Sequence, residues 1–303
     1  MRIVHINNIG GVAWDLRTSQ IEMGDSATVI AHRRYSMNRP DVDLRLDGLI
    51  GINLELPLYQ RGLLRHADII HIHGGIRRTQ FVFRLLRRIS KGKWVLHYHG
   101  SESRLGYGMH HMDLADLKLV GTPDLRRWHE DSVWLPNPIE ASLFNKPRPP
   151  ARKSSRLRIG HFPNDPSIKG TARIERALKP LVDAGQIELV VHEKMGHDDL
   201  LSEIMKTDLV IDQLSDLSIY GKTSLEAMIF GIPAISSYDE AIFPSGCPII
   251  KAMTEEELRG RVEEIVRDGI DEGLRRKSID YVFEHHHPMK VARTLKGLYT
   301  SIM

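Results

Sequence analysis

Short apolar runs recur along the chain, and each one ends in polar residues or glycine. We expect parallel strands at these runs, because a strand buried on both faces of a sheet is a near-continuous apolar segment. The expected strands lie at 2–7, 26–31, 67–75, 93–100, 119–121, 157–162, 187–191, 208–211 and 234–236. Segments typical of helices lie between and after them, at 12–23, 81–89, 172–181, 221–232, 255–266 and 288–303. Strands that alternate with helices predict an α/β protein built on parallel sheets.

The length of the chain and one proline-rich segment predict two domains. A chain of 303 residues suits two domains of ordinary size. Residues 146–156 read Lys-Pro-Arg-Pro-Pro-Ala-Arg-Lys-Ser-Ser-Arg, which is typical of an extended, charged linker. We therefore expect one Rossmann-like domain over 1–148, a second over 157–287 and a terminal helix over 288–303.

Composition narrows the class of protein. Apolar residues make up 41% of the chain, and no apolar run reaches the 18 residues of a membrane-spanning helix. The first residues turn polar too soon for a signal peptide. The single cysteine, Cys247, excludes an internal disulfide and fits a reducing compartment, so we expect a cytoplasmic protein.

Charge is divided unevenly between the two halves. Residues 1–150 carry 21 Lys and Arg against 15 Asp and Glu, a net charge of +6, whereas residues 151–303 carry 21 against 24, a net charge of −3. The basic half implies an anionic partner, but +6 is too small to indicate nucleic acid, and we expect none.

Residues 208–237 have the pattern of half a phosphate site. Asp208 to Ile211 is a short buried strand, Gly221 opens a helix, and Gly231 with Pro233 ends it. A helix that begins just past a strand directs backbone N–H groups and the positive end of its dipole toward the sheet edge where α/β proteins bind anions.

A second strand–loop–helix segment carries a positively charged residue, Lys169. Residues 158–171 end a strand in a proline-containing loop, and Lys169-Gly170-Thr171 opens the next helix. A lysine there supplies a compact positive charge to a diphosphate, although a lysine in a solvated loop would look the same.

Near the start of the chain, Gly10-Gly11 follows the first strand, as either a tight turn or a ligand loop. It lacks the full Gly-x-Gly-x-x-Gly pattern, which disfavours a nicotinamide cofactor.

Tyr220 to Pro233 reads Tyr-Gly-x-x-x-x-Glu-Ala-Met-x-x-Gly-x-Pro. This run resembles the donor-binding signature of the retaining, nucleotide-sugar-dependent glycosyltransferases of family 4. The resemblance implies the GT-B fold, with two Rossmann-like domains facing each other across a cleft and the terminal helix returning to the first. It also implies that Glu226 holds the ribose and that the amides of Tyr220, Gly221, Lys222 and Thr223 contact the diphosphate. Ser218 stands where the family usually has a second glutamate.

Other segments carry the same resemblance. His99 to Arg104, His-Gly-Ser-Glu-Ser-Arg, is similar to the motif whose histidine faces the transferred sugar, and Gly10-Gly11 lies where the family's backbone approaches the donor. Lys169 matches the family's diphosphate lysine, whereas Pro163 stands where an arginine is common. The resemblance further places Asn164 in the donor loop and His192, Glu193 and Lys194 at the pocket for the base. Catalytic roles are thus expected for His99, Lys169 and Glu226.

No metal or other cofactor is expected. Asp41-Val42-Asp43 matches the Asp-x-Asp of another glycosyltransferase fold, but a surface loop explains it better. His71-Ile72-His73 and His97-Tyr98-His99 each place two imidazoles on one face of a strand, which is compatible with zinc. Without cysteines or suitably spaced carboxylates nearby, hydrogen-bonded histidines are the better interpretation.

The basic segment 77–93 has two interpretations. Its arginines either form a solvated helix face or rest on anionic lipid headgroups, which would place the protein at the inner face of a membrane. The resemblance implies transfer of a sugar from a nucleotide diphosphate to a glycan or a lipid-linked glycan of the cell surface. Two alternatives stay open: a GT-B nucleotide-sugar epimerase or hydrolase, and a degenerate GT-B subunit that supports a partner enzyme. Lys169→Ala and Glu226→Ala are each expected to abolish most transfer without unfolding the protein.

Overall fold

The computed structural model describes residues 1–32, 42–46, 61–74, 84, 87–88, 90–104, 114–147, 156–217, 219–243 and 246–303. The chain divides into two compact units. Unit 1 contains residues 1–140 together with 286–303, and unit 2 contains residues 141–285. Asp41, most of 81–89 and Ser218 lie outside the described residues, so the predictions for them stay predictions.

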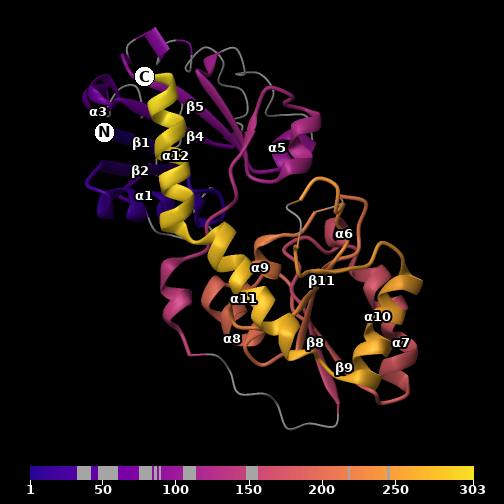
Figure 1. The fold of residues 1–303 in the computed structure, drawn as a ribbon. Helices are drawn as coiled ribbons and strands as arrows, with labels where there is room; N and C mark the ends of the chain where they lie inside the picture. Colours follow the sequence, from indigo (N-terminus) through magenta and orange to yellow (C-terminus); the bar gives the residue numbers. More distant parts are fainter. Residues whose placement is uncertain are drawn as a thin grey trace. The chain divides into compact units, whose positions relative to one another are not determined.

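Unit 1 is built on a parallel sheet of seven strands in the order β3-β2-β1-β4-β5-β6-β7 (Figure 1). The strands are β1 (Arg2–Ile6), β2 (Ser26–His32), β3 (Leu44–Leu46), β4 (Ile69–His73), β5 (Lys93–Tyr98), β6 (Leu117–Val120) and β7 (Val133–Trp134). Side chains alternate between the two faces of each strand, so β1, β2, β4, β5 and β6 each contribute to two separate cores.

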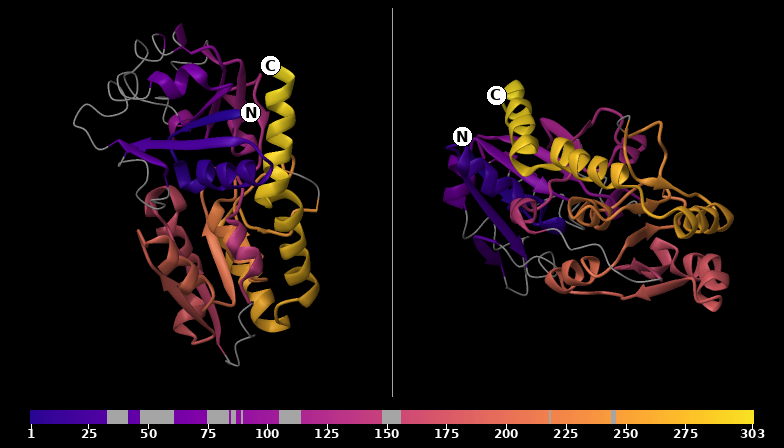
Figure 2. Two further views of the ribbon diagram at one scale, coloured as in Figure 1. Left: turned by 90° about the vertical axis from the view of Figure 1, so that its left-hand side faces the viewer. Right: turned by 60° about the horizontal axis from the view of Figure 1, so that its bottom comes forward.

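Helices cover both faces of this sheet. On one face, α1 (Val12–Glu22) and the terminal α12 (Pro288–Ile302) pack beside each other, and Leu16, Leu295 and Tyr299 are fully buried against the strands (Figures 1 and 2). On the other face Leu64 of α3 (Arg61–His66) packs in the core that contains Trp94. The last residues of the chain therefore complete the core begun by the first.

Unit 2 is built on a parallel sheet of five strands in the order β12-β11-β10-β8-β9. The strands are β8 (Leu157–His161), β9 (Ile187–Val191), β10 (Leu209–Gln213), β11 (Ala234–Ser236) and β12 (Ile250–Lys251). The helices are α6 (Pro166–Lys169), α7 (Thr171–Asp183), α8 (His197–Ile204), α9 (Lys222–Ile229), α10 (Glu255–Asp268) and α11 (Glu272–His286).

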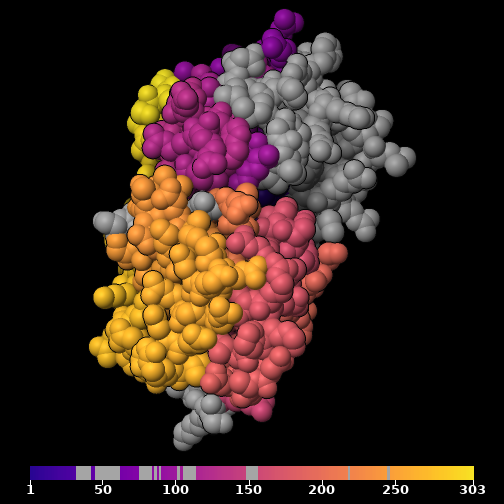
Figure 3. Space-filling view, turned by 90° about the vertical axis from the view of Figure 1, so that its right-hand side faces the viewer, coloured from indigo at the N-terminus to yellow at the C-terminus, as the bar shows by residue number. Residues whose placement is uncertain are grey.

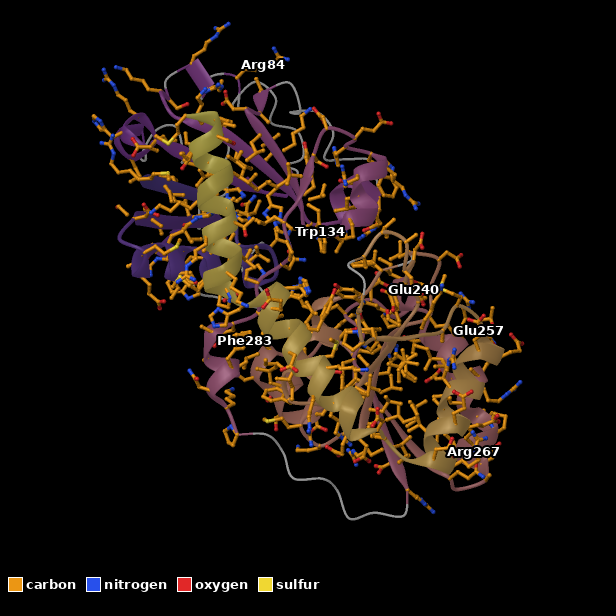
Figure 4. All side chains as sticks on the ribbon, in the orientation of Figure 1. Arg84, Trp134, Glu240, Glu257, Arg267 and Phe283 are labelled. Carbon is orange, nitrogen blue, oxygen red and sulfur yellow. The ribbon has the colours of Figure 1, made fainter. Side chains whose placement is uncertain are left out.

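Helix α10 shows how the sequence sets the ends of a helix. The Thr254 hydroxyl accepts from the Glu257 N–H, and the Glu257 carboxylate accepts from the Met253 N–H, which gives a capping-box arrangement. Arg267 lies in the last turn, where a cation favours the helix dipole, and Figure 4 shows Glu257 and Arg267 at opposite ends of the helix. Figure 3 shows the face of unit 2 on which the orange segment containing α10 lies beside the salmon segment containing α7, and these two helices are in contact.

The prediction of two α/β domains on parallel sheets is confirmed. Across the described residues, no helix is long and apolar enough to cross a membrane. Two short elements differ from the prediction. A one-turn helix, α6, precedes the helix expected at 172–181, so Lys169 ends α6 instead of opening α7. The 3-10 helix η1 (Ile9–Gly11) forms where a glycine turn was expected.

Candidate functional site

Lys169 lies at the carboxyl end of the unit 2 sheet, in the turn that joins α6 to α7. Gly170 makes this turn possible, because its φ is +72° and a Cβ there would collide with the carbonyl oxygen of Leu214. The Leu214 N–H in turn donates to the Lys169 carbonyl at 3.0 Å. The turn is thereby held against the end of β10, and the Lys169 side chain reaches the residues that end this strand.

Asp212 and Gln213, the last residues of β10, hold the Lys169 ammonium. Nζ donates to Asp212 Oδ1 at 2.7 Å and to Gln213 Oε1 at 3.1 Å. The Gln213 amide is oriented by its own bond to the Ile219 carbonyl at 2.7 Å. A lysine ammonium has three donors, so within the described chain one donor of Lys169 is left for a ligand. The Asp212 side chain is 1% exposed and that of Lys169 is 22% exposed, so solvent reaches the cation and not its partner.

The second oxygen of Asp212 binds the start of α9. Oδ2 accepts from the Gly221 backbone N–H and from the Ser224 hydroxyl, the latter at 2.9 Å. Burial by itself would raise the pKa of Asp212, but the charge and hydrogen bond of Lys169 and the bonds from Gly221 and Ser224 outweigh it, and the pKa is lowered. Asp212 is therefore a carboxylate that ties the cation to the positive end of a helix.

The network of Lys169, Asp212 and Gly221 differs in one respect from the phosphate site expected from the sequence. Gly221 precedes α9 as expected, but in this structure its N–H is bonded to Asp212, so the site offers the remaining Lys169 donor and the first turn of α9. Lys222 and Thr223, both half-buried, form that first turn. The Tyr220 side chain is buried, and its hydroxyl lies 2.8 Å from that of Tyr281, so only its backbone is placed to contact a ligand.

Glu226 lies one turn further along α9 and is paired with a histidine. Its side chain is buried, and Oε1 accepts from Nε2 of His197, the first residue of α8, at 2.9 Å. Because a carboxylate only accepts, Nε2 of His197 carries the proton in this contact. Lys222, four residues earlier on α9, is the partner that helical spacing alone would offer Glu226. The structure gives Glu226 a partner from another helix, which fixes the direction of one carboxylate oxygen.

The other predicted residues of unit 2 line the loops after β8 and β9. Asn164, His192, Glu193 and Lys194 are exposed. Lys194 has a φ of +54°, and its N–H donates to the Pro163 carbonyl at 3.2 Å, which joins the two loops. The predicted donor loop and the predicted base pocket are therefore neighbours at one sheet edge.

In unit 1 the predicted glycines form the turn between β1 and α1. Gly10 and Gly11 have φ values of +57° and +79°, which explains why glycine occupies both positions. Gly10 is exposed, whereas Gly11 is buried and caps α1. The turn thus presents backbone at the carboxyl end of β1, as the ligand-loop interpretation requires.

His99 follows β5 at the same edge of the unit 1 sheet and is half-buried. Its motif also builds the loop that follows. Arg104 binds Asp124 at 2.7 Å and the Thr122 hydroxyl at 3.2 Å, and a Cβ at Gly100 would collide with the Arg104 guanidinium. Arg104 therefore joins this loop to the segment after β6, and the motif has a structural role as well as any catalytic one.

Two histidine triads are close enough for a metal ion. The ligand nitrogens lie within 4.8 Å of one another in His5, His71 and His73, and again in His73, His97 and His99. One pair of rings in each triad is stacked, however: His71 and His73 lie 4.2 Å apart with planes 23° from parallel, and His73 and His99 lie 5.3 Å apart with planes 14° from parallel. Lone pairs lie in the ring plane, so stacked rings direct them side by side instead of toward one point.

The Asp43 carboxylate, from the Asp-x-Asp, is bonded to Arg17 and to the Val29 N–H.

The described part of the basic segment includes one arginine with a structural role. Arg87 binds Asp116 at 2.9 Å and the Gly92 carbonyl at 3.0 Å, and its guanidinium lies over the Trp94 ring. Arg77 and Arg78 lie outside the described residues. Arg87 therefore has a structural role, and the choice between the two interpretations of the segment stays a prediction.

Four residues of the site were not identified from the sequence: Asp212, Gln213, His197 and His161. Asp212 and Gln213 had a signal, since two polar residues that end an apolar strand lie at the binding edge of a parallel sheet. His161 donates from Nδ1 to the Ile211 carbonyl at 2.8 Å and accepts the Thr171 hydroxyl at 2.9 Å, which fixes the start of α7. His197 had no signal, because its partner lies 29 residues away.

Comparison of the structure with solved structures identifies glycosyltransferases. An alpha-glucosyltransferase in complex with UDP and a 13-mer DNA containing a HMU base matches with a TM-score of 0.73 and 12% identity, over 99% of each chain. The catalytic domain of starch synthase IV from Arabidopsis thaliana, bound to ADP and acarbose, matches with a TM-score of 0.65 and 13% identity, over 100% of this chain and 99% of that one. A glycosyltransferase of avilamycin A biosynthesis matches with a TM-score of 0.56 and 13% identity, over 100% and 98%.

At the level of sequence, no protein-family model and no curated protein matches the chain. The likeness therefore concerns the fold. Two α/β domains on parallel sheets match the glycosyltransferase structures over nearly their whole length. The protein has the GT-B fold.

Proposed function

We propose that the protein is a glycosyltransferase that moves a sugar from a nucleotide diphosphate to an acceptor hydroxyl with retention. The observation that carries this proposal is the network of Lys169, Asp212 and Gly221, which fixes a cation beside the first turn of α9 at the carboxyl edge of a parallel sheet. An edge of this kind is where open α/β sheets bind phosphates. Fold neighbours that hold UDP or ADP support the same interpretation.

The chemistry proposed for these residues is electrostatic. When the bond between sugar and diphosphate breaks, negative charge grows on the leaving phosphate, and Lys169 with the first turn of α9 stabilises it. Glu226, directed by His197, holds the ribose hydroxyls. His99 and the Gly10-Gly11 turn position the sugar, and the departing diphosphate takes the acceptor's proton. No step in this scheme is assigned to a metal ion.

A thermal-shift screen of nucleoside diphosphates and their sugars tests the proposal. A ligand at 100 times its dissociation constant stabilises the folded protein by about 2.7 kcal/mol, which corresponds to an increase in Tm of roughly 5–10 °C. We expect UDP, ADP or GDP to give such a shift and the matching nucleoside to give a smaller one. Absence of a shift with every diphosphate at millimolar concentration would remove the proposed function.

His197→Ala separates the ribose contact from the phosphate contact. If His197 directs Glu226, the variant loses about tenfold in affinity for the diphosphate found in the screen and for its nucleoside alike, since both contain ribose. Lys169→Met weakens only the diphosphate. Isothermal titration with both ligands measures the difference, and His66→Ala, at an exposed histidine of α3 outside the predicted site, is the control. An effect of His197→Ala on the diphosphate alone would contradict the ribose role.

Two kinds of acceptor are proposed. A glycan or lipid-linked glycan follows from the family resemblance. DNA with a modified base is the second candidate, because the matched alpha-glucosyltransferase structures include complexes with DNA. Transfer to DNA would fall steeply as salt rises, whereas transfer to a neutral glycan would not. Radiolabelled donor supplied with each acceptor at 50 and 200 mM salt distinguishes them.

The rival functions predict other products. An epimerase or hydrolase would consume the donor without any acceptor, and a degenerate subunit would bind the donor and leave it unchanged. Ser218 and Pro163, which depart from the family pattern, favour the degenerate subunit. The built contacts of Lys169 and Glu226 favour the enzyme. Product analysis after incubation with and without acceptor decides among the three.

A further inference from the structure

Four buried histidines of unit 1 lie together on one face of the sheet, and His99 extends the row. His5 of β1 is opposite His71 of β4, and His73 of β4 is opposite His97 of β5. All four are essentially inaccessible to solvent, on the face that α1 and α12 cover. His99 follows β5 directly, and its ring lies 4.2 Å from that of His97 and 5.3 Å from that of His73.

Three of these rings form a continuous hydrogen-bonded chain that begins at Gln20 of α1. Gln20 Oε1 lies 2.8 Å from His5 Nε2, and His5 Nδ1 lies 3.0 Å from His73 Nε2. His73 Nδ1 then lies 3.1 Å from His99 Nε2. His5 and His73 each use both nitrogens, so the chain runs without a gap from the α1 face of the core to the half-buried ring at the sheet edge.

The first link decides the direction of every other link. A carbonyl oxygen cannot donate, so His5 Nε2 carries the proton. The structure places the Gln20 carbonyl oxygen, and not the amide nitrogen, toward His5. Within the described residues the Gln20 amide nitrogen makes no hydrogen bond, so the carbonyl is the hydrogen-bonded group of this side chain.

The rings inside the chain are neutral. Burial lowers the pKa of His5 to about 4, and burial together with the neighbouring histidines lowers that of His73 well below 6.5. A neutral imidazole has one donor and one acceptor. With the proton of His5 on Nε2, its Nδ1 accepts from His73 Nε2–H, and His73 Nδ1 accepts from His99 Nε2–H.

We propose that Gln20, His5 and His73 are positioning residues that hold His99 in the tautomer with its proton on Nε2. Nδ1 of His99 is then a hydrogen-bond acceptor and cannot donate. With its proton on Nε2, the His99 ring can accept a hydrogen bond from a sugar hydroxyl at Nδ1. A ring that exchanged between the two tautomers could accept this hydrogen bond only part of the time. This inference rests on the proposed function for the ligand, but the state of the ring can be measured without any ligand.

Nuclear magnetic resonance of ¹⁵N-histidine-labelled protein tests the tautomer directly, because protonated and bare ring nitrogens have distinct shifts. His99→Asn identifies the signals of His99. We expect protonated Nε2 and bare Nδ1 in the wild type and a mixture in Gln20→Met, which keeps the side-chain volume and removes the carbonyl. Ser19→Ala, a buried neighbour on α1 outside the chain, should leave the signals unchanged. If Gln20→Met does not fold, His5→Leu breaks the next link.

Kinetics provide the second readout. Gln20→Met is expected to lower kcat/KM about tenfold, the value of one hydrogen bond, while donor binding by the phosphate and ribose contacts is retained. A proton on Nδ1 of wild-type His99 would overturn the inference, even with normal transfer. Stoichiometric uptake of Zn²⁺ or Co²⁺ that is lost in His71→Asn would overturn it too, since the rings would then be ligands. Absence of transfer with the expected tautomer would count against the proposed function alone.

Discussion

Replacing Lys169 with methionine is expected to lower sugar transfer by about 10²–10³-fold, because the change removes the cation that stabilises the leaving diphosphate. The variant also leaves Asp212 as a buried carboxylate without its counter-charge. We therefore expect unit 2 to lose about 3 kcal/mol of unfolding free energy, near the lower end for a broken buried pair because Lys169 is partly exposed. Initial rates at saturating donor and urea unfolding measure the two effects.

A second substitution separates activity from stability. Lys169→Met combined with Asp212→Asn contains no unpaired buried charge, so most of the lost stability should return while transfer stays low. Asp212→Asn alone keeps the cation and removes what orients it, and about a tenfold loss of transfer is expected. Lys169→Arg should not restore activity, since a planar guanidinium does not fit a site built for an ammonium. Transfer near the wild-type rate in the double variant would contradict the role of Lys169.

Acidification from pH 7 to pH 5 is expected to unfold unit 1 before unit 2. Burial, with smaller effects of neighbouring groups, lowers the pKa of His5 to about 4 and those of His71, His73 and His97 well below 6.5. Between these values and 6.5 the unfolded state binds more protons, so stability is complete above about pH 6.5 and falls as the pH approaches 4. His5 alone accounts for about 2 kcal/mol at pH 5, which is a substantial part of the total stability of a domain, and the other three histidines act in the same direction.

Tryptophan fluorescence can follow unit 1 by itself, because all four tryptophans, Trp14, Trp94, Trp128 and Trp134, lie within residues 1–140. Urea titrations at pH 7.5, 6.0 and 5.0 should show a steep loss of stability by this probe. His97→Leu should weaken the dependence of stability on pH, because it removes one ring that takes up a proton when unit 1 unfolds. The substitution costs no hydrogen bond, since the ring nitrogens of His97 make none to any described residue. His192→Gln, at an exposed position, is the control. A pH-independent midpoint in the wild type would show that the rings are not neutral in the folded state.

The order of the strands and helices followed from local pattern. Apolar runs such as Ile69–His73 and Leu209–Gln213 are strands because a run of five residues is too short for a buried helix. Gly231 ends α9 in the left-handed conformation that glycine favours. Lys169 and Gly221 were proposed in the same way, because each lies after a strand where a helix was expected to begin. The role of Glu226 was implied by the resemblance of Tyr220 to Pro233 to the donor-binding signature of family 4.

Tertiary structure decided which groups these residues contact. Asp212 takes up the Gly221 amide and one donor of Lys169, His197 reaches Glu226 from another helix, and Gln20 sets the proton order of three histidines on different strands. Each of these contacts joins segments whose separation along the chain carries no periodic signal. The sequence by itself determined the fold class and the residue types at the sheet edges, because secondary structure reflects neighbouring residues. Protonation, pairing and the stability cost of a substitution were decided only when packing brought distant side chains into a dry interior, where an unpaired charge is expensive.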